Sequence, residues 1–375
     1  MSFPLPAAEL GSLRIDAGQW ARLEATIERH IAAKRYPGAQ IALARNAALG
    51  LQRSFGQRRI GHPAVPVDER TLFLLYSQTK VLVAAAVWRL VEAGELRYAD
   101  RVAAIVPGFA AHGKGEISIF QVMSHQAGFP DAEIGEEAWE DHEFLRRSVC
   151  ELPLQWPPGS RCDYHPEAAH WVLAVVIEAV TGRDYREVVR RSVIGPLGLS
   201  DDLFIGVPDS EHARIAALYE PDDAGGQRLR PREDRPAFWR AGVPGGGGYG
   251  TARGLAAFYQ MMLGGGTLNG RRLLSPRTIE YVTRNVTGDR IDGYMGMPMH
   301  RGLGPHLRGL TPTIRGLGTL ASPRTFGHGG VGTSYSWADP DSGVAFAYLS
   351  NSRIPDPWHS ARLDVISNIV HAAID

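Results

Sequence analysis

Cysteine, net charge and long hydrophobic runs are all scarce in this chain of 375 residues. Its two cysteines, Cys150 and Cys162, match no metal-ligand spacing and no disulfide framework, so free thiols are expected, although two thiols this close in sequence could pair. A formal net charge of +0 argues against a nucleic-acid-binding surface. No apolar stretch approaches the roughly 20 residues of a transmembrane helix, and the first residues lack the features of a secretory signal. We therefore expect a globular, cytoplasmic protein that binds neither nucleic acid nor membrane.

Lysine is scarce as well. The chain has 40 lysines and arginines together, yet lysine occurs only at Lys34, Lys80 and Lys114. Arginine stays protonated in proteins, whereas a buried lysine can lose its proton and act as a base. A lysine in an arginine-rich chain is therefore a candidate for a residue whose amine acts as a base. Lys80 is such a candidate, because it follows Ser77 by three residues.

The residues after Lys80 predict a buried helix. Positions 81–88 are apolar on every side, and Gly94 is a plausible end. Residues three apart share a helix face, so Ser77 and Lys80 can touch. Burial and the positive end of the helix dipole both lower the pKa of Lys80, which would make Ser77 an activated nucleophile. The alternative is that Ser77 caps the helix and Lys80 extends to the surface.

Hydrophobic patterns predict strands near both termini with helices between them. An amphipathic helix is expected over 16–34 and a last helix over about 361–373, with strands at 40–45, 51–56, 333–339 and 344–350. We expect one sheet built from both ends of the chain and a helical insertion between them. The loops at 222–235 and 287–320 are rich in Gly, Pro and Arg and are expected to be mobile or to line a site.

Several short segments occur in a characteristic order. They are TLFLLYSQTK at 71–80, LVEAGEL at 90–96, MSHQAG at 123–128, PG at 158–159, DYHP at 163–166, IEAVTG at 177–182, FGHGG at 326–330, DP at 339–340 and LSN at 349–351. On these segments the chain resembles the serine β-lactamase and penicillin-binding-protein superfamily. The resemblance is to the class C-like branch with the family VIII carboxylesterases, from about residue 27 to about residue 351.

This resemblance implies the fold. The expected architecture is α/β (α+β): an antiparallel sheet from both termini flanked by helices, plus a mostly helical inserted lobe. The α/β lobe would span about 1–76 and 285–375, and the helical lobe about 77–284. The cleft between the lobes would hold Ser77 at a buried helix start.

The resemblance also assigns catalytic roles. Ser77 would attack the substrate carbonyl, Lys80 would take the proton of Ser77, and Tyr164 would be the second proton-handling group. A phenol hydrogen-bonded to a lysine can relay a proton to the leaving oxygen or nitrogen. Read without its segment, Tyr164 would be a core tyrosine near a helix start.

Substrate contacts are implied in the same way. The backbone N–H groups of Ser77 and Val331 would form an oxyanion hole, and Gly329 and Gly330 would let their strand approach the substrate closely. His328 stands where penicillin-recognising relatives carry the Lys of K-T-G. Its alternative reading is a polar strand-end residue with no catalytic role.

Two further matched segments contribute His125 and Tyr249 as substrate-binding candidates. The glycine-rich run at 244–250 lacks the Lys-Ser/Thr of a P-loop. The sequence has no G-x-S-x-G elbow, no H-E-x-x-H and no cluster of His and Cys ligands. We therefore expect a reaction without cofactor or metal.

Two departures from the family pattern bear on the substrate. The usual Tyr-x-Asn is Tyr164-His165-Pro166 here, and the Lys of K-T-G is His328. Both changes weaken recognition of β-lactams and peptides more than they weaken acyl transfer, because ester cleavage needs less help at the leaving group. We therefore predict ester hydrolysis through an acyl-serine, with acyl transfer to an alcohol as a variant.

Two alternatives stay open. A β-lactamase or D-amino-acid peptidase would act outside the cytoplasm, which the missing signal argues against. A non-catalytic binding relative would have no reason to keep Ser77, Lys80 and Tyr164 together. The predicted partner is a small-molecule ester, and a homo-oligomer is left open.

Overall fold

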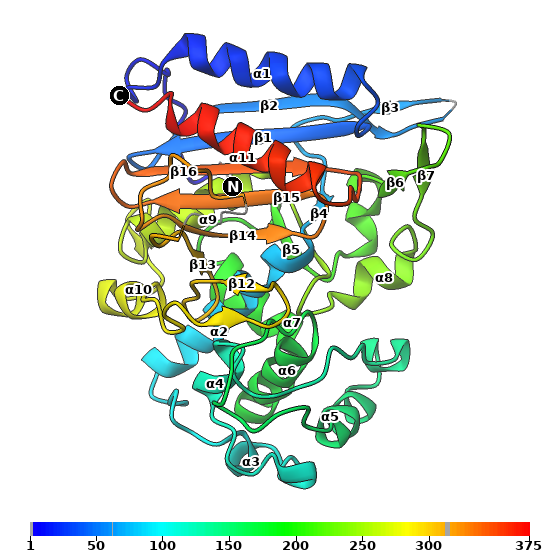
Figure 1. The fold of residues 1–375 in the computed structure, drawn as a ribbon, viewed down its shortest axis with the longest axis vertical. Helices are drawn as coiled ribbons and strands as arrows, with labels where there is room; N and C mark the ends of the chain where they lie inside the picture. The colour runs from blue at the N-terminus through cyan, green and yellow to red at the C-terminus, as the bar shows by residue number, and fades with distance from the viewer. Residues whose placement is uncertain (1–2, 62, 312–315) are drawn as a thin grey trace.

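A seven-stranded antiparallel sheet dominates one end of the molecule (Figure 1). The computed structural model describes residues 3–61, 63–311 and 316–375. The strand order is β13-β14-β15-β16-β1-β2-β3. The strands are β1 (Gly38–Arg45), β2 (Ala48–Arg59), β3 (Val65–Pro66), β13 (His306–Leu307), β14 (Phe326–Gly330), β15 (Ser334–Asp339) and β16 (Val344–Ser350). Strand β1 pairs with β16, so the expected sheet from both termini is confirmed.

The two faces of this sheet differ in side-chain size. On β1 and β16, Ile41, Leu43, Phe346 and Tyr348 face helices α1 (Ala17–Ala32) and α11 (Trp358–His371), the helices expected near the two termini. The intervening small residues, among them Ala42, belong to the other core with α9 (Ala252–Leu263). The period-2 alternation thus builds two cores, one on each side of the sheet.

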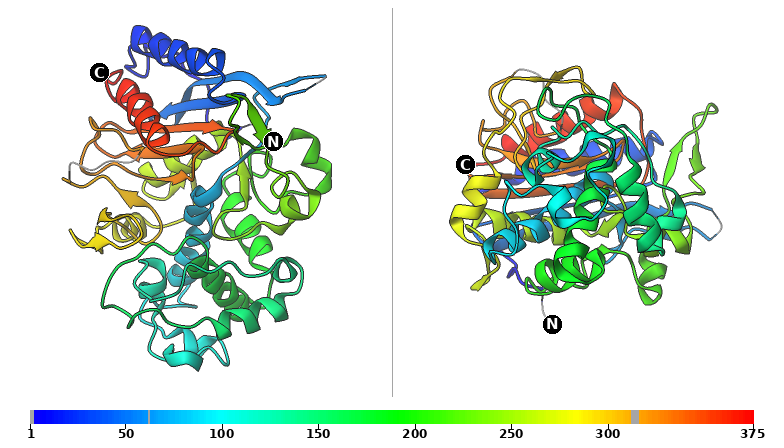
Figure 2. Two further views of the ribbon diagram at one scale, coloured as in Figure 1. Left: turned by 45° about the vertical axis from the view of Figure 1, so that its right-hand side comes forward. Right: turned by 90° about the horizontal axis from the view of Figure 1, so that it is seen from below.

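The helices between the strand-forming ends lie on the α9 side of the sheet (Figure 2). They are α2 (Thr79–Glu92), α3 (Val102–Ile105), α4 (Ile119–Met123), α5 (His142–Glu151), α6 (Ala168–Thr181), α7 (Tyr185–Val189), α8 (Pro236–Ala241) and α10 (Pro276–Val282). Helix α2 is buried at every position from Thr79 to Trp88, as its all-round apolar sequence predicts. No helix in the described part of the chain combines the length and apolar character needed to cross a bilayer.

Short strands and turns complete the fold. A three-stranded sheet joins β4 (Phe73–Leu74), β8 (Gly248–Gly250) and β5 (Leu203–Ile205), and it brings a glycine-rich loop beside the start of α2. The remaining strand pairs are β6 (Tyr219–Pro221) with β7 (Gln227–Leu229), β9 (Thr267–Leu268) with β10 (Arg271–Arg272), and β11 (Ile291–Asp292) with β12 (Met297–Pro298). Short 3₁₀ helices are η1 (Tyr76–Gln78), η2 (Ala111–Gly113), η3 (Glu136–Trp139) and η5 (Asp209–Arg214), and η4 (Arg190–Ile194) is a π-helical segment after α7.

Candidate active site

Ser77 lies on η1, between β4 and α2. The Leu75 N–H donates to the Gly248 carbonyl at 2.8 Å, and the chain then turns at Tyr76, whose φ is 45°. A non-glycine residue in this left-handed region typically costs about 1–3 kcal/mol and must be held by its surroundings. Here the Tyr76 hydroxyl donates to the buried Glu233 carboxylate at 3.2 Å. This anchored turn presents Ser77 at the start of the buried helix.

Lys80 is wholly buried directly beneath Ser77. Its Nζ donates to the carbonyl oxygens of Pro166 and Gly245, both at 2.5 Å, and lies 3.2 Å from the Ser77 Oγ. A neutral amine has two N–H groups and one lone pair. With both N–H groups directed to carbonyls, the lone pair is left for the Ser77 hydroxyl. Burial lowers the pKa of Lys80 to about 7, against the charge of Glu167, which raises it. A substantial fraction of Lys80 is therefore in the neutral, deprotonated form near pH 7.

The glycine-rich run at 244–250 shapes this environment. A Cβ on Gly245 would lie 3.4 Å from the Lys80 Nζ and 3.0 Å from the Pro166 carbonyl oxygen. A Cβ on Gly248 would lie 2.8 Å from the Thr79 Oγ1, which accepts the Gly248 N–H at 2.9 Å. The glycines allow backbone to approach α2 closely enough to accept a bond from Lys80. The sequence of this run did not predict its close approach to Lys80.

Tyr164 lines the same cavity as Ser77. Burial raises its pKa to about 12, while the interaction with Ser77 lowers it. Its buried hydroxyl forms no well-aligned hydrogen bond within the described residues. The Lys80 Nζ lies 5.1 Å from the centre of the Tyr164 ring. The expected Lys80–Tyr164 hydrogen bond is not formed, because both N–H groups of the neutral Lys80 amine are directed to the Pro166 and Gly245 carbonyls.

A buried ion pair missed in the sequence supports Tyr164. Arg301 and Asp292 are joined at 2.6 Å, and Asp292 also accepts the Tyr164 backbone N–H at 3.2 Å. The Arg301 guanidinium carbon lies 4.8 Å from the centre of the Tyr164 ring. Both charged residues come from the 287–320 loop, where no motif marked them. Residues 312–315 of that predicted loop lie outside the described residues.

His328 is neutral and belongs to a chain of polar rings. Burial, followed by the charge of Lys80, lowers its pKa to about 3. Its Nδ1–H donates to the Gly329 carbonyl at 2.9 Å, and its ring centre lies 4.0 Å from that of His306. His306 in turn accepts from the Arg301 Nη1 at 2.7 Å through its Nε2. His328 thus offers an uncharged edge to the cavity in place of a lysine.

The cavity over Ser77 has a volume of about 730 Å³, within the range of small-molecule sites. Tyr164, His328, Gly329, Gly330 and Val331 line it with Ser77. The structure therefore brings these sequence-predicted residues to one cavity, with Lys80 beneath it.

His125 and Tyr249 lie elsewhere. His125 is buried with its ring 4.8 Å from that of Tyr164, and its Nδ1 accepts the His165 N–H at 3.1 Å. It therefore supports the segment that carries Tyr164. Tyr249 is buried on β8 between β4 and β5. Neither residue lines the cavity over Ser77.

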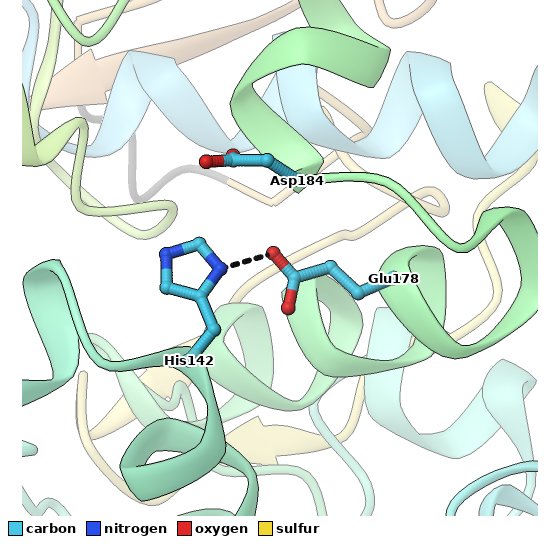
Figure 3. A group of neighbouring side chains, drawn as sticks. All are labelled: His142, Glu178 and Asp184. Carbon is cyan, nitrogen blue, oxygen red and sulfur yellow. Dashed lines mark ion pairs between the residues drawn. The ribbon is translucent and has the colours of Figure 1, made fainter.

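One group has the spacing of metal ligands in the described part of the chain: His142, Glu178 and Asp184 (Figure 3). His142 and Glu178 are joined at 2.7 Å. Asp184 is instead paired with Arg186 at 2.6 Å, and the same guanidinium lies 3.3 Å from the His142 Nε2. A resident guanidinium already supplies the positive charge, so this group fits a structural ion-pair network rather than a metal. None of these residues lines the cavity over Ser77.

Comparison with known proteins finds similarity in sequence and in fold over most of the chain. Residues 23–369 match the Beta-lactamase family. The chain is 29% identical over 317 residues to the Esterase/beta-lactamase LipL of Mycobacterium tuberculosis, covering 76% of this chain and 71% of LipL. It resembles the structure of a penicillin-binding-protein homologue from Caulobacter crescentus with a TM-score of 0.81, 27% identity and coverage of 96% and 99%. A family VIII carboxylesterase structure gives a TM-score of 0.79, 29% identity and coverage of 94% and 98%.

Proposed function

Because the chain belongs to the Beta-lactamase family, we propose that it is a serine hydrolase that cleaves carboxylic esters through an acyl-serine intermediate. The observation that carries this proposal is the environment of Lys80. Its two shortest hydrogen bonds go to carbonyl oxygens, and the lone pair of the neutral amine is left to face the Ser77 Oγ at 3.2 Å. Such an amine is a base aimed at a single hydroxyl.

In the proposed reaction, the Ser77 Oγ forms a bond to the ester carbonyl carbon and its proton passes to the Lys80 Nζ. The carbonyl oxygen becomes an oxyanion, for which the Ser77 and Val331 N–H groups are the proposed donors. The intermediate then expels the alcohol, whose oxygen takes a proton from the Tyr164 hydroxyl, and the acyl group stays on Ser77. The proton held by Lys80 passes to Tyr164, which leaves Lys80 neutral again. Water, or a second alcohol, attacks the acyl-serine with the same base, and the Ser77 hydroxyl is restored.

The proton-handling roles follow from the two different pKa values. A pKa of about 7 lets Lys80 gain and lose a proton near neutrality, whereas a pKa of about 12 keeps Tyr164 a neutral phenol. Lys80 is therefore the proposed base, and Tyr164 the proposed donor to the leaving oxygen. The charge of Arg301 against the Tyr164 ring favours a phenol that can give up its proton.

Ester specificity is supported by the two departures from the family pattern, at His328 and Pro166. His328 is uncharged and Pro166 offers only a carbonyl, which Lys80 already occupies. Neither can bind a substrate as the Lys and Asn of the family pattern would. The name of the family VIII structure agrees with esterase activity, and that of the Mycobacterium tuberculosis relative gives both esterase and beta-lactamase. Similarity to the Caulobacter penicillin-binding-protein homologue supports β-lactamase or peptidase activity as the second candidate function.

Kinetics with p-nitrophenyl esters of graded acyl length beside nitrocefin test the proposal. We expect kcat/KM for the best ester to exceed that for nitrocefin by roughly tenfold or more, because loss of one hydrogen bond to a charged or amide group costs about 1.5–3 kcal/mol. Comparable values, or a preference for nitrocefin, would replace the esterase with the second candidate. A protein that cleaves neither substrate class and forms no acyl-serine would be a non-catalytic relative.

A further inference from the structure

The cavity over Ser77 extends to a rim of arginines on β7, directly after β7 and after β16. Four arginines line the cavity: Arg228, Arg230, Arg301 and Arg353. We propose that Arg353 forms a subsite for a carboxylate on the substrate, so that the preferred substrates are esters that carry a second, anionic group. This proposal rests on the proposed ester-cleaving function and names the class of ester.

Arg353 is fixed close to the proposed oxyanion hole. Its backbone N–H donates to the Tyr219 carbonyl at 2.7 Å, and the next residue, Ile354, donates to the Gly332 carbonyl at 2.9 Å. A Cβ on Gly332 would lie only 2.7 Å from the Arg353 Cγ. The arginine stem therefore packs against the residue that follows Val331. Gly332, with a φ of 70°, leaves the space that this contact needs.

The charge of Arg353 also reaches the nucleophile turn. Burial and Glu233 raise the pKa of Tyr76, and both Arg230 and Arg353 lower it. The Arg353 guanidinium therefore lies within electrostatic reach of the Tyr76 hydroxyl, and Tyr76 directly precedes Ser77 in the chain. Because Ser77 and Arg353 line the same cavity, an ester bound at Ser77 can direct an anionic group toward Arg353.

The other three arginines have carboxylate partners. Arg228 and Arg230 each bind Glu220 at 2.6 Å, and Arg230 also binds Glu233 at 2.8 Å. Arg301 is held by Asp292. Within residues 3–61, 63–311 and 316–375, Arg353 alone of the four cavity arginines has no carboxylate partner.

The acidic residues at this rim have structural roles. Glu220 holds two arginines, as above, and Asp356 accepts the Ser360 N–H at 2.9 Å and its hydroxyl at 2.6 Å near the start of α11. The Arg353 guanidinium is therefore still available to donate hydrogen bonds to a substrate carboxylate. Arginine also presents a planar fork that matches a carboxylate in two-point binding.

The test compares two matched series of esters. One series is the mono-p-nitrophenyl esters of dicarboxylic acids with graded spacers, and the other is the same esters with the free carboxyl methylated. We expect wild-type kcat/KM to favour the acidic member of at least one pair by roughly two- to fivefold, the range of a partly exposed ion pair. This ratio should fall as salt is raised, because the pair is partly exposed.

Variants assign the preference to one residue. Arg353→Met should bring the ratio near one, and Arg353→Glu should invert it toward the methylated ester. Arg22→Met is the matched control, since Arg22 is an exposed arginine on α1 away from the cavity, and it should keep the wild-type ratio. An equal ratio in wild type and Arg353→Met would overturn the subsite.

Binding to a Ser77→Ala protein separates this inference from the proposed function. Calorimetry with the same ester pairs measures affinity without turnover. A preference for the acidic ester that Arg353→Met abolishes supports the subsite even if no ester is cleaved. Equal affinities for the two esters contradict the subsite even if ester cleavage is fast.

Discussion

Arg301 and Asp292 form an ion pair whose side chains are 2% and 0% exposed, directly beside Tyr164. Asp292 Oδ2 accepts from both the Nε and Nη2 of Arg301, and Oδ1 accepts the Tyr164 N–H. A buried ion pair recovers little net free energy, because its desolvation opposes its Coulomb attraction. Its value here is geometric: it fixes the backbone of Tyr164 and a permanent positive charge against the ring.

Removing one member of this pair is predicted to be costly. Asp292→Asn leaves the Arg301 charge buried without its counter-charge, which should lower the free energy of unfolding by about 3–5 kcal/mol. The double variant Asp292→Asn/Arg301→Met removes both charges and should recover part of that loss. Chemical denaturation of the wild type, both single variants and the double variant gives the coupling energy. Additive effects would show that the two residues act independently.

Lys80→Arg is predicted to abolish most ester turnover. Arginine keeps the charge but stays protonated, so no base faces Ser77. We expect kcat/KM to fall by roughly 10²-fold or more, the usual contribution of a general base. Lys34→Arg, at an exposed position, is the control and should retain wild-type kinetics. Near-normal turnover in a folded Lys80→Arg protein would remove Lys80 from the mechanism.

The proposed nucleophile should be trapped covalently. A fluorophosphonate reacts with an activated serine, so the intact mass should rise by one adduct, and peptide mapping should place that adduct on Ser77. Ser77→Ala should remain unlabelled under the same conditions. Persistent labelling of Ser77→Ala would assign the nucleophile to another residue.

The pH dependence of kcat/KM should report Lys80. Its pKa, lowered by burial to about 7, means that the base is protonated and inactive below that pH, so the rate should rise as pH increases through about 7. Tyr164, with its pKa raised to about 12, keeps its proton throughout the accessible range. Tyr164→Phe should therefore reduce the rate while leaving the acid limb near pH 7. An acid limb that moves strongly in Tyr164→Phe would assign the titration to Tyr164.

Local sequence was sufficient for the main elements. The apolar run after Lys80 predicted a helix buried on all sides, because such a run has no face to offer to water. Alternating residues near both termini predicted the strands and one sheet built from both ends of the chain. The pairing of β1 with β16 joins those ends. The three-residue spacing of Ser77 and Lys80 likewise determined their contact, since one helical turn separates them.

The scarcity of lysine did not by itself identify a base. Lys114 is also buried, but its Nζ donates to the carbonyls of Ala111, Cys150 and Leu152 at 2.8, 2.7 and 2.6 Å. Its three donors satisfy carbonyl groups that include the end of α5, so its role is structural. The two lysines differ in their third neighbour: Lys80 lies beside the Ser77 hydroxyl, whereas Lys114 contacts a third carbonyl.

Tertiary structure decided what surrounds the reacting groups. The carbonyl partners of Lys80 lie 86 and 165 residues away along the chain, on Pro166 and Gly245. Backbone carbonyls are present at every residue, so no pattern of side chains can mark which of them will meet an amine. The Asp292–Arg301 pair and the contact of His125 with Tyr164 were not predicted either, because no motif marks these residues as neighbours in space. Sequence spacing determines contacts within one helical turn, whereas contacts across the cavity depend on how the whole chain packs.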